Sequence, residues 1–317
     1  MKVLVTGAGG FLGARVVTQL LDRGHAVRAM VRPAAATVPA AWRDRAEIVR
    51  ADLRAVPAME SLFDGVDVLV HLAATVRGSP EAQFVGSAVC TEKLLEGMRR
   101  AGSTRHIVLA SSFSVYDATA ATRTITEASP VRARPYDCDG YTVAKVWQER
   151  VARRMADENN WTLAVLRPGL IYGPGAASDG AGITLGGVCL VVAPFSRLRL
   201  THVENCAAAF ADAAEKKVAG TFNLVDDEHI SAWGYAGRLS RQTVRVPVPY
   251  AAGLALAYLA KLTSRVLFPP KGGKLPEVLN PRPYRARFRP FIYDTRQAKA
   301  VLGWKCRPFF ADGCDVT

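Results

Sequence analysis

Short apolar runs alternate with amphipathic stretches along the first 225 residues of the chain, and this pattern predicts alternating strands and helices. Runs that stay apolar over several successive residues are typical of strands buried on both faces of a parallel sheet. The predicted strands are 2–5, 26–31, 48–53, 66–74, 105–112, 162–167 and 220–225. Helices are predicted after the first strand, over 84–101 and from residue 141. The pattern therefore predicts a doubly wound parallel α/β fold.

Three glycines follow the first predicted strand at once, and an amphipathic helix begins among them. Gly7 allows a tight turn, Gly10 lets the backbone approach a pyrophosphate, and Gly13 lets the helix pack closely on the strand. The free N–H groups at the start of the helix would then bind the anion. Strand, glycines and helix in this order indicate a dinucleotide site, whereas the alternative is an ordinary glycine turn.

A second stretch, Tyr141-Thr-Val-Ala-Lys145, places a phenol and an ammonium four residues apart on a predicted helix. The two side chains therefore share a face, and Gln148 falls on it too. An ammonium beside a phenol favours the phenolate, so Tyr141 would become an acid or base near neutral pH. A solvated surface pair is the alternative interpretation of this spacing.

Thr6-Gly-x-x-Gly-x-x-Gly13 together with Tyr141-x-x-x-Lys145 resembles the extended short-chain dehydrogenase/reductase family, the NAD(P)-dependent epimerase/dehydratase group. The resemblance runs almost from end to end. It implies a Rossmann domain over 1–175, to which 201–230 returns. It also implies a smaller, mostly helical substrate lobe formed mainly by 176–200 and 231–317.

The family pattern places a catalytic serine or threonine four residues before the tyrosine of a Val-Tyr pair, here Tyr116, and so selects Ser112. Ser111 and Ser114 are the nearby alternatives. The hydroxyl would bond the substrate oxygen while Tyr141 exchanges the proton. The catalytic residues implied are Ser112, Tyr141 and Lys145, and the substrate-binding residues implied are Ser112, Ser114, Tyr116 and Tyr172.

The resemblance also implies which residues hold the dinucleotide. Arg32 ends the second strand, where an acidic residue would bind a ribose 2′-hydroxyl and an arginine accommodates a 2′-phosphate. With Arg28 as a second candidate, this favours NADP(H), and NAD(H) stays open. The cofactor-binding residues implied are Gly7, Gly10, Phe11, Leu12, Arg32, Asp52, Leu53, Leu72, Ala73, Ala74, Tyr141, Lys145 and Pro168.

Two departures from the family pattern bear on function. Ser87 stands where an asparagine usually supports the active-site hydrogen bonds, and a serine hydroxyl could still bond there. Leu170 stands where nucleotide-sugar enzymes commonly have an asparagine that contacts the diphosphate. Leucine cannot make that bond, so the substrate is expected not to be a nucleotide sugar. His71 and His202 are expected to be structural.

Charge and cysteine content limit the partners and the cellular location that are expected for this chain. The net charge is +13, yet no nucleic-acid motif is evident, so a diffuse basic surface that partly serves a phosphorylated cofactor is expected. No signal peptide and no membrane span are indicated. Without a C-x-x-C pair, neither a metal site nor a redox motif is suggested, and free thiols in a cytoplasmic protein are expected at Cys90, Cys138, Cys189, Cys206, Cys306 and Cys314. The family implies a homodimer.

The last third is less regular. Residues 117–140 are predicted to form a loop over the site, and 176–200 a mobile substrate loop. The apolar stretch 250–268 could pack on the substrate lobe, line a pocket or lie on a membrane surface. The arginines that follow could clamp phosphates, form a solvated edge or contact lipid headgroups; they are Arg282, Arg285, Arg287 and Arg289.

These features predict an NAD(P)-dependent oxidoreductase that transfers hydride between a nicotinamide and a secondary alcohol or ketone. Residues 167–170 and the apolar stretch resemble the 3β-hydroxysteroid dehydrogenase and dihydroflavonol reductase branch, which implies a steroid-, flavonoid- or lipid-like substrate. The alternative is an NAD-dependent nucleotide-sugar epimerase. A dehydratase is disfavoured because Phe113 follows Ser112 where an acidic residue would be wanted. A dinucleotide-binding regulator without turnover is the third hypothesis.

Overall fold

The computed structural model describes residues 1–33, 38–56, 58–120, 122–175, 182–185, 187–239, 244–267 and 280–311. A seven-stranded sheet lies at its centre, in the order β12-β7-β5-β4-β1-β2-β3, and all neighbours are parallel. The strands are β1 (Lys2–Thr6), β2 (Ala26–Val31), β3 (Ala46–Arg50), β4 (Val68–His71), β5 (His106–Ala110), β7 (Thr162–Pro168) and β12 (Gly220–Leu224). The predicted doubly wound α/β fold is therefore confirmed, although the third strand begins and ends earlier than expected.

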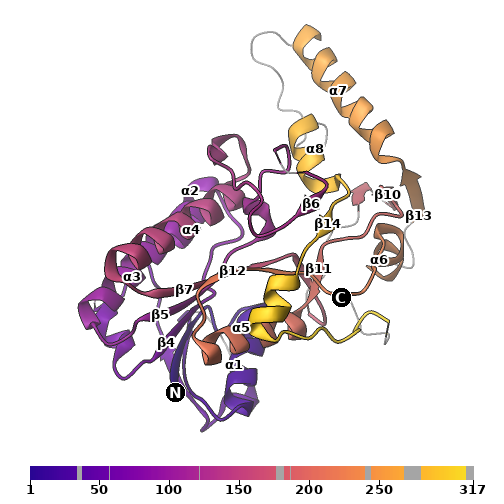
Figure 1. The fold of residues 1–317 in the computed structure, drawn as a ribbon. Helices are drawn as coiled ribbons and strands as arrows, with labels where there is room; N and C mark the ends of the chain where they lie inside the picture. Colours follow the sequence, from indigo (N-terminus) through magenta and orange to yellow (C-terminus); the bar gives the residue numbers. More distant parts are fainter. Residues whose placement is uncertain are drawn as a thin grey trace.

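Helices cover both faces of this sheet, as Figure 1 shows. Helices α1 (Phe11–Asp22) and α5 (Val203–Lys216) pack on one face, and α3 (Cys90–Ala101) and α4 (Gly140–Asn159) pack on the other. Alternation along each strand divides the core between the faces: Val3 and Val5 join the cluster under α1 and α5, while Leu4 joins the cluster under α3 and α4. This explains why the strands are apolar at every position.

The helix predicted over 84–101 is interrupted. Helix α2 (Pro80–Phe84) is followed by a π-helical turn, Val85–Val89, before α3 begins. At this turn the backbone of Gly86 lies so close to Thr75 that an added Cβ would be 2.0 Å from the threonine Oγ1. The turn thus brings the segment after β4 against the helix, and π-turns are frequently found at functional sites.

Segments before and after β12 form a smaller lobe. It contains a three-stranded sheet of β9 (Gly182–Leu185), β10 (Val188–Val192) and β13 (Val244–Val248), and helices α6 (Ala232–Leu239), α7 (Tyr250–Leu267) and α8 (Pro281–Phe288). The expectation of a mobile loop over 176–200 is corrected, because β9 and β10 pair antiparallel; residues 176–181 and 186 lie outside the described residues. Residues 188–192 are all apolar, and three of the five are valine, which favours a strand.

Short pairs and turns complete the fold. Strand β8 (Leu170–Tyr172) pairs with β11 (Leu200–His202), and β6 (Thr124–Ile125) pairs with β14 (Ile292–Tyr293). The second pair ties the segment after α8 to the loop 117–140. Single turns of 3₁₀-helix lie at Ala40–Trp42, Met59–Phe63, Phe113–Val115 and Pro135–Asp137, and a π-helical turn lies at Ala298–Leu302. The five described cysteines are free thiols, as expected, and Cys314 lies outside the described residues.

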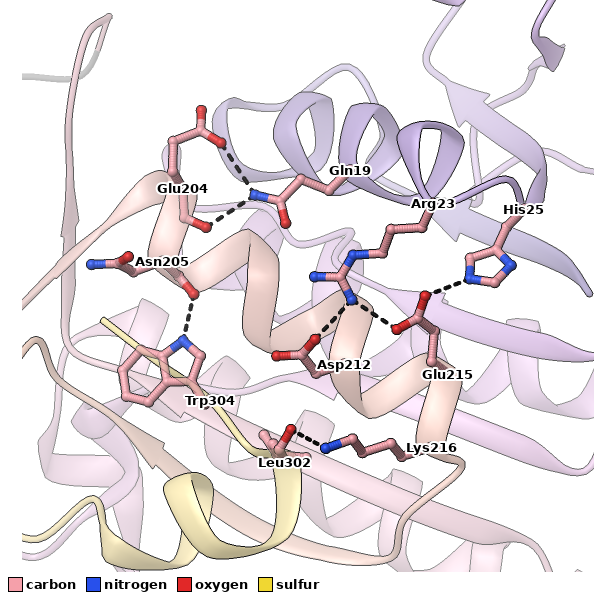
Figure 2. A network of polar contacts seen from close by, with 10 residues as sticks. All are labelled: Gln19, Arg23, His25, Glu204, Asn205, Asp212, Glu215, Lys216, Leu302 and Trp304. Carbon is pink, nitrogen blue, oxygen red and sulfur yellow. Dashed lines mark hydrogen bonds and ion pairs between the residues drawn. The ribbon is translucent and has the colours of Figure 1, made fainter. Parts of the chain in front are cut away.

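Helix α5 is held between α1 and the end of the chain (Figure 2). On one side, Arg23 at the end of α1 donates to Asp212 and Glu215 of α5 at 2.7 and 2.8 Å. On the other side, the indole N–H of Trp304 donates to the carbonyl of Asn205 at 2.7 Å. Trp304 is 2% exposed and belongs to the cluster under α1 and α5, so the end of the chain completes the core of the central sheet.

Replacing Trp304 with alanine should lower the free energy of unfolding by about 3–5 kcal/mol, because it leaves a cavity. It also removes the hydrogen bond to Asn205. The control Val301→Ala changes a side chain that is 41% exposed on the same segment and should cost below about 0.5 kcal/mol. Urea unfolding measures both values, and equal losses in the two variants would contradict this account of the core.

Candidate active site

The turn after β1 brings two backbone segments into close approach. Gly7 has a φ of +70°, and a Cβ built there would lie 2.8 Å from the backbone nitrogen of Ala73. A Cβ at Gly13 would lie 2.2 Å from the carbonyl oxygen of Gly7. The N–H of Gly10 closes the turn by donating to that same carbonyl at 3.0 Å. Only glycine fits at positions 7 and 13 without movement of the backbone.

The start of α1 is open to an anion. Gly10 is its N-cap and provides no side-chain acceptor, and the first turn of the helix contains no acidic residue. The first N–H groups of a helix have no partner within it, and they carry partial positive charge. With the close backbone approach at Gly7 and Gly13, these residues fit a dinucleotide pyrophosphate.

The other residues expected to bind the cofactor lie at the carboxyl ends of the parallel strands. Arg32 directly follows β2 and is exposed, and Asp52 and Leu53 follow β3. Leu72, Ala73 and Ala74 follow β4, and Pro168 ends β7. Ligands of open α/β sheets bind along this edge.

Charged groups at this edge have defined partners. Asp52 accepts hydrogen bonds from the guanidinium and from the backbone N–H of Arg54, and these bonds, with a smaller contribution from Arg32, lower the pKa of Asp52 to about 2. Arg28 was expected to assist Arg32, and the structure corrects this. Its buried guanidinium donates to Glu47 at 2.7 Å and to the carbonyl of Leu62 at 2.7 Å, so it is held within the protein.

Helix α4 carries the predicted catalytic face. Asp139 caps its start by accepting from the N–H of Thr142 at 3.0 Å. The ammonium of Lys145 is 4% exposed and donates to the carbonyl of Ala110 at 2.7 Å and to the side-chain oxygen of Gln148 at 2.8 Å. Burial lowers the pKa of Lys145 to about 8, against the opposite effect of nearby Glu149.

Tyr141 lies one helical turn before Lys145, and its phenol lies near the side chain of Ser112. Burial raises the pKa of the phenol, and the contact with Ser112 acts in the opposite direction. This corrects the expectation that the ammonium of Lys145 lowers the pKa of Tyr141. The ammonium instead bonds Ala110 and Gln148, so at neutral pH the phenol keeps its proton.

The three neighbouring serines differ in their hydrogen-bond partners. The hydroxyl of Ser111 donates to the carboxylate of Glu149 at 2.8 Å, so it is committed to the core. Ser112 contacts Tyr141, and its oxygen accepts from the N–H of Ser114 at 3.2 Å. The hydroxyl of Ser114 is buried without a hydrogen-bond partner among the described residues. The geometry thus brings Ser112 to the tyrosine.

A series of buried polar side chains, joined by hydrogen bonds, extends from Lys145 to the end of β1. The amide nitrogen of Gln148 donates to Thr91 at 2.9 Å and to the carbonyl of Ala73 at 3.2 Å. His71 bridges Thr91 and Thr6, at 2.7 and 2.6 Å. Burial lowers the pKa of His71 to about 3, so the ring is neutral and structural, as expected. This series connects the lysine to the glycine turn at the end of β1.

Ser87 takes part at the far end of this series, in the π-helical turn. Its hydroxyl oxygen accepts from the N–H of Thr75 at 3.1 Å, and its carbonyl accepts from Thr91 at 2.7 Å. The serine therefore still bonds where the family usually has an asparagine, and its partner is the segment that follows β4.

A buried ion pair joins α4 to β7. Glu149 and Arg167 are 5% and 3% exposed, and the guanidinium Nε lies 3.2 Å from the carboxylate. The same guanidinium stacks over the ring of Tyr116 at 4.6 Å, while the phenol of Tyr116 donates to Asn223 at 2.6 Å. Tyr116 is thus fixed from its face and from its hydroxyl end.

Beside Tyr141 lies a cavity of about 600 Å³. Its wall includes Ser114, Tyr116 and Tyr141 but not Ser112, together with parts of the loop 117–140 and of α8. The wall is both aromatic and basic. The other aromatic residues of the wall are Phe113, Tyr284, Phe288, Phe291 and Tyr293, and the charged residues are Arg132, Arg134, Arg199, Arg282, Arg287, Asp117, Asp137 and Asp139.

The structure places Tyr172 away from this cavity. Its ring is fully buried, packs edge-on against Tyr235 at 6.1 Å, and its hydroxyl donates to Asp226 at 3.4 Å. Leu170 packs on the same apolar cluster. His202 caps α5 by accepting from the N–H of Glu204 at 3.3 Å, which agrees with a structural role. Tyr172 is therefore part of the core in this structure rather than of the cavity wall.

Sequence reasoning missed much of the wall. Arg132 donates to the carbonyl of Ser114 at 3.4 Å, and Phe291 and Tyr293 arrive through the pairing of β14 with β6. No local pattern announces these residues, because they reach the cavity only through contacts between distant segments.

Comparison with known proteins agrees with this geometry. The model of the NAD dependent epimerase/dehydratase family matches residues 3–225, and the chain belongs to this family. The chain is 33% identical to a 3 beta-hydroxysteroid dehydrogenase/Delta 5-->4-isomerase of Mycobacterium tuberculosis, over 55% of this chain and 48% of the relative. It is 28% identical to the sterol-4-alpha-carboxylate 3-dehydrogenase, decarboxylating, of Mus musculus, over 84% of this chain and 77% of the relative.

The first of these matches is partial, because the aligned region spans about half the length of that relative. Among solved structures, gox2253 superposes with a TM-score of 0.78 at 23% identity, covering 99% of this chain and 96% of the other. MoeE5 in complex with UDP-glucose and NAD superposes with a TM-score of 0.70 at 22% identity, covering 100% and 97%. These structures confirm the fold. By name, the proteins that this chain resembles include dehydrogenases, reductases and epimerases.

The buried ammonium of Lys145 should make stability depend on pH. The folded protein releases this proton at a pKa of about 8 and the unfolded chain near 10.5, so unfolding takes up a proton between these values. The stability of the wild type relative to Lys145→Met should therefore rise by about 3 kcal/mol as the pH increases over this window.

Urea unfolding of the ligand-free protein at successive pH values measures this difference. Lys93→Met replaces an exposed lysine and serves as the matched control. A difference between wild type and Lys145→Met that stays constant with pH would show that the lysine is not buried as a titrating ammonium.

Proposed function

We propose that this chain transfers hydride between a nicotinamide cofactor and a secondary alcohol or ketone. The proposal rests mainly on one observation: Tyr141 lies at the wall of a cavity, one helical turn before a buried lysine, Lys145, which hydrogen bonds connect to the end of β1. When bound, the cofactor supplies the hydride, while the protein supplies alignment and proton transfer.

Each polar side chain then has a role. Ser112 donates a hydrogen bond to the substrate oxygen, and Tyr141 gives its proton to that oxygen or takes it back. Because burial raises the pKa of Tyr141, the phenol is protonated at neutral pH and prepared for reduction of a carbonyl. Lys145 holds the cofactor ribose and, in the oxidative direction, stabilises the phenolate by its positive charge.

The substrate is proposed to be a hydrophobic, steroid-, flavonoid- or lipid-like compound. Aromatic side chains form much of the cavity wall, and Leu170 lies in an apolar cluster where it offers no polar bond. The names of three relatives agree with this class: the steroid and sterol dehydrogenases above, and a ceramide reductase of Caulobacter vibrioides that is 29% identical over 71% of this chain.

A nucleotide-sugar epimerase is the second candidate, and the five arginines of the cavity wall favour it. One of them, Arg282, is already paired with Asp137 at 3.1 Å on the surface. Thermal-shift measurements with steroids, flavonoids and UDP-sugars separate the two candidates, because a ligand stabilises the fold in proportion to its occupancy.

Replacing Tyr141 with phenylalanine should lower turnover by at least about 100-fold, because the proton donor is lost. Affinity for the cofactor should stay within a few-fold, since the ring remains. Tyr136→Phe changes an exposed phenol outside the cavity wall and serves as the control, with activity close to that of the wild type. Initial rates and cofactor titration measure both quantities, and near-normal turnover of Tyr141→Phe would exclude the proposed acid.

NADP(H) is the proposed cofactor, because Arg32 is exposed directly after β2. Arg32→Asp should weaken NADPH by about tenfold or more relative to NADH, because a charge-assisted bond to the 2′-phosphate is replaced by repulsion. Arg43→Asp, a nearby exposed arginine, controls for the change in net charge. Fluorescence titration gives both affinities, and equal weakening of NADPH and NADH would contradict the assignment.

A further inference from the structure

Helix α7 extends away from the body of the protein beside α8, as Figure 1 shows. Its first half is fixed on α8: Ala257 is fully buried, and a Cβ at Gly253 would lie 2.0 Å from the hydroxyl oxygen of Tyr284. The Tyr284 hydroxyl also donates to the carbonyl of Tyr250 at 3.2 Å. One side of α7 is therefore packed, and the helix is held in a defined direction.

The opposite side of α7 exposes large apolar side chains. Leu256, Leu259 and Leu262 are 58%, 56% and 60% exposed, and Tyr258 is 48% exposed. The three leucines follow one another at three-residue spacing, so they lie along one side of the helix. They are also the three leucines with large exposure among the described residues. Single exposed apolar residues are ordinary, whereas a contiguous group marks an interaction surface.

The same part of the chain carries most of the net positive charge. Residues 238–293 contain eleven lysines and arginines and a single acidic residue, Glu277, while the whole chain has a net charge of +13. The sequences of α7 and α8 include no acidic residue. Basic and apolar groups are also adjacent in space, since the guanidinium of Arg285 lies 5.6 Å from the ring centre of Tyr258.

We propose that α7 and α8 bind the surface of an anionic phospholipid bilayer, with Leu256, Leu259 and Leu262 in contact with the acyl chains. A helix with an apolar side flanked by lysine and arginine lies in the interface plane of such a bilayer. Each basic residue near the surface contributes about 1 kcal/mol of attraction to anionic lipid. Among the described helices, none is long and apolar enough to span a membrane.

Charge argues against a second copy of this chain as the occupant. A symmetric contact would bring α7 and α8 of one copy onto the same helices of the other, so two basic surfaces would meet. The phosphates of a nucleic acid would attract the basic residues, but they would offer no apolar surface to the exposed leucines. An anionic bilayer satisfies both, because headgroups and acyl chains lie at successive depths.

The proposed surface adjoins the cavity. Arg282, Tyr284, Arg287 and Phe288 of α8 line the cavity wall, while α7 packs on the same helix. An apolar compound dissolved in the bilayer would therefore meet the protein on the side where the cavity is formed. Binding to the bilayer does not depend on the proposed reaction, so the two are tested separately.

Flotation of the whole protein with vesicles tests the proposal. Vesicles of phosphatidylcholine alone are compared with vesicles that also contain phosphatidylglycerol, and both are repeated at about 0.5 M salt, where screening is strong. The wild type should bind only the anionic vesicles, and high salt should weaken the binding. The Leu256→Ser/Leu259→Ser/Leu262→Ser variant should bind at least about tenfold more weakly, since three apolar contacts are lost.

Two further variants complete the design. Lys261→Glu should also weaken binding to anionic vesicles, whereas Val301→Ser, an exposed apolar residue on a different segment, should bind as the wild type does. Size-exclusion chromatography and circular dichroism show whether each variant keeps its fold and its oligomeric state. The proposal is overturned if the wild type binds neither vesicle, if the leucine variant binds as well as the wild type, or if that variant instead loses self-association.

Discussion

The buried ammonium of Lys145 is the constraint on which the site depends. A buried charge is costly unless hydrogen bonds replace its hydration, and here the carbonyl of Ala110 and the side chain of Gln148 do so. The first bond ties α4 to the end of β5, directly before the serines. The second continues through Thr91 and His71 to the glycine turn. One charged group thereby holds the helix that carries Tyr141 against β5 and connects it to the glycine turn after β1.

The central sheet provides the rigid support for this arrangement. Because β1, β4 and β5 contribute alternate side chains to two separate cores, a shift of any strand by one residue would exchange both cores, so the register is strongly determined. The carboxyl ends of these strands then fall at fixed positions along one edge. The ion pair between Glu149 and Arg167 fixes α4 to β7 as well, and through Arg167 it orients Tyr116 at the cavity.

The sequence predicted those features of the site that depend only on residues close together in the chain. The spacing of Gly7, Gly10 and Gly13 and the helical spacing of Tyr141, Lys145 and Gln148 act within one turn or one helix face, so the sequence was sufficient. Positions set by distant segments were not predicted: Arg28 turns towards Glu47 and Leu62, and Phe291 reaches the cavity through the pairing of β14 with β6. The pKa of Tyr141 also depended on where the ammonium pointed, which spacing alone does not fix.

The central claim is that Tyr141 and Lys145 meet the nicotinamide half of a dinucleotide held at the start of α1. A crystal structure of the protein with NADP⁺ tests it most directly. The account predicts that the pyrophosphate lies against the backbone of Gly7–Gly13 and that the nicotinamide riboside contacts Tyr141 and Lys145. A dinucleotide bound elsewhere, or bound at the glycine turn with its nicotinamide away from Tyr141, would contradict it.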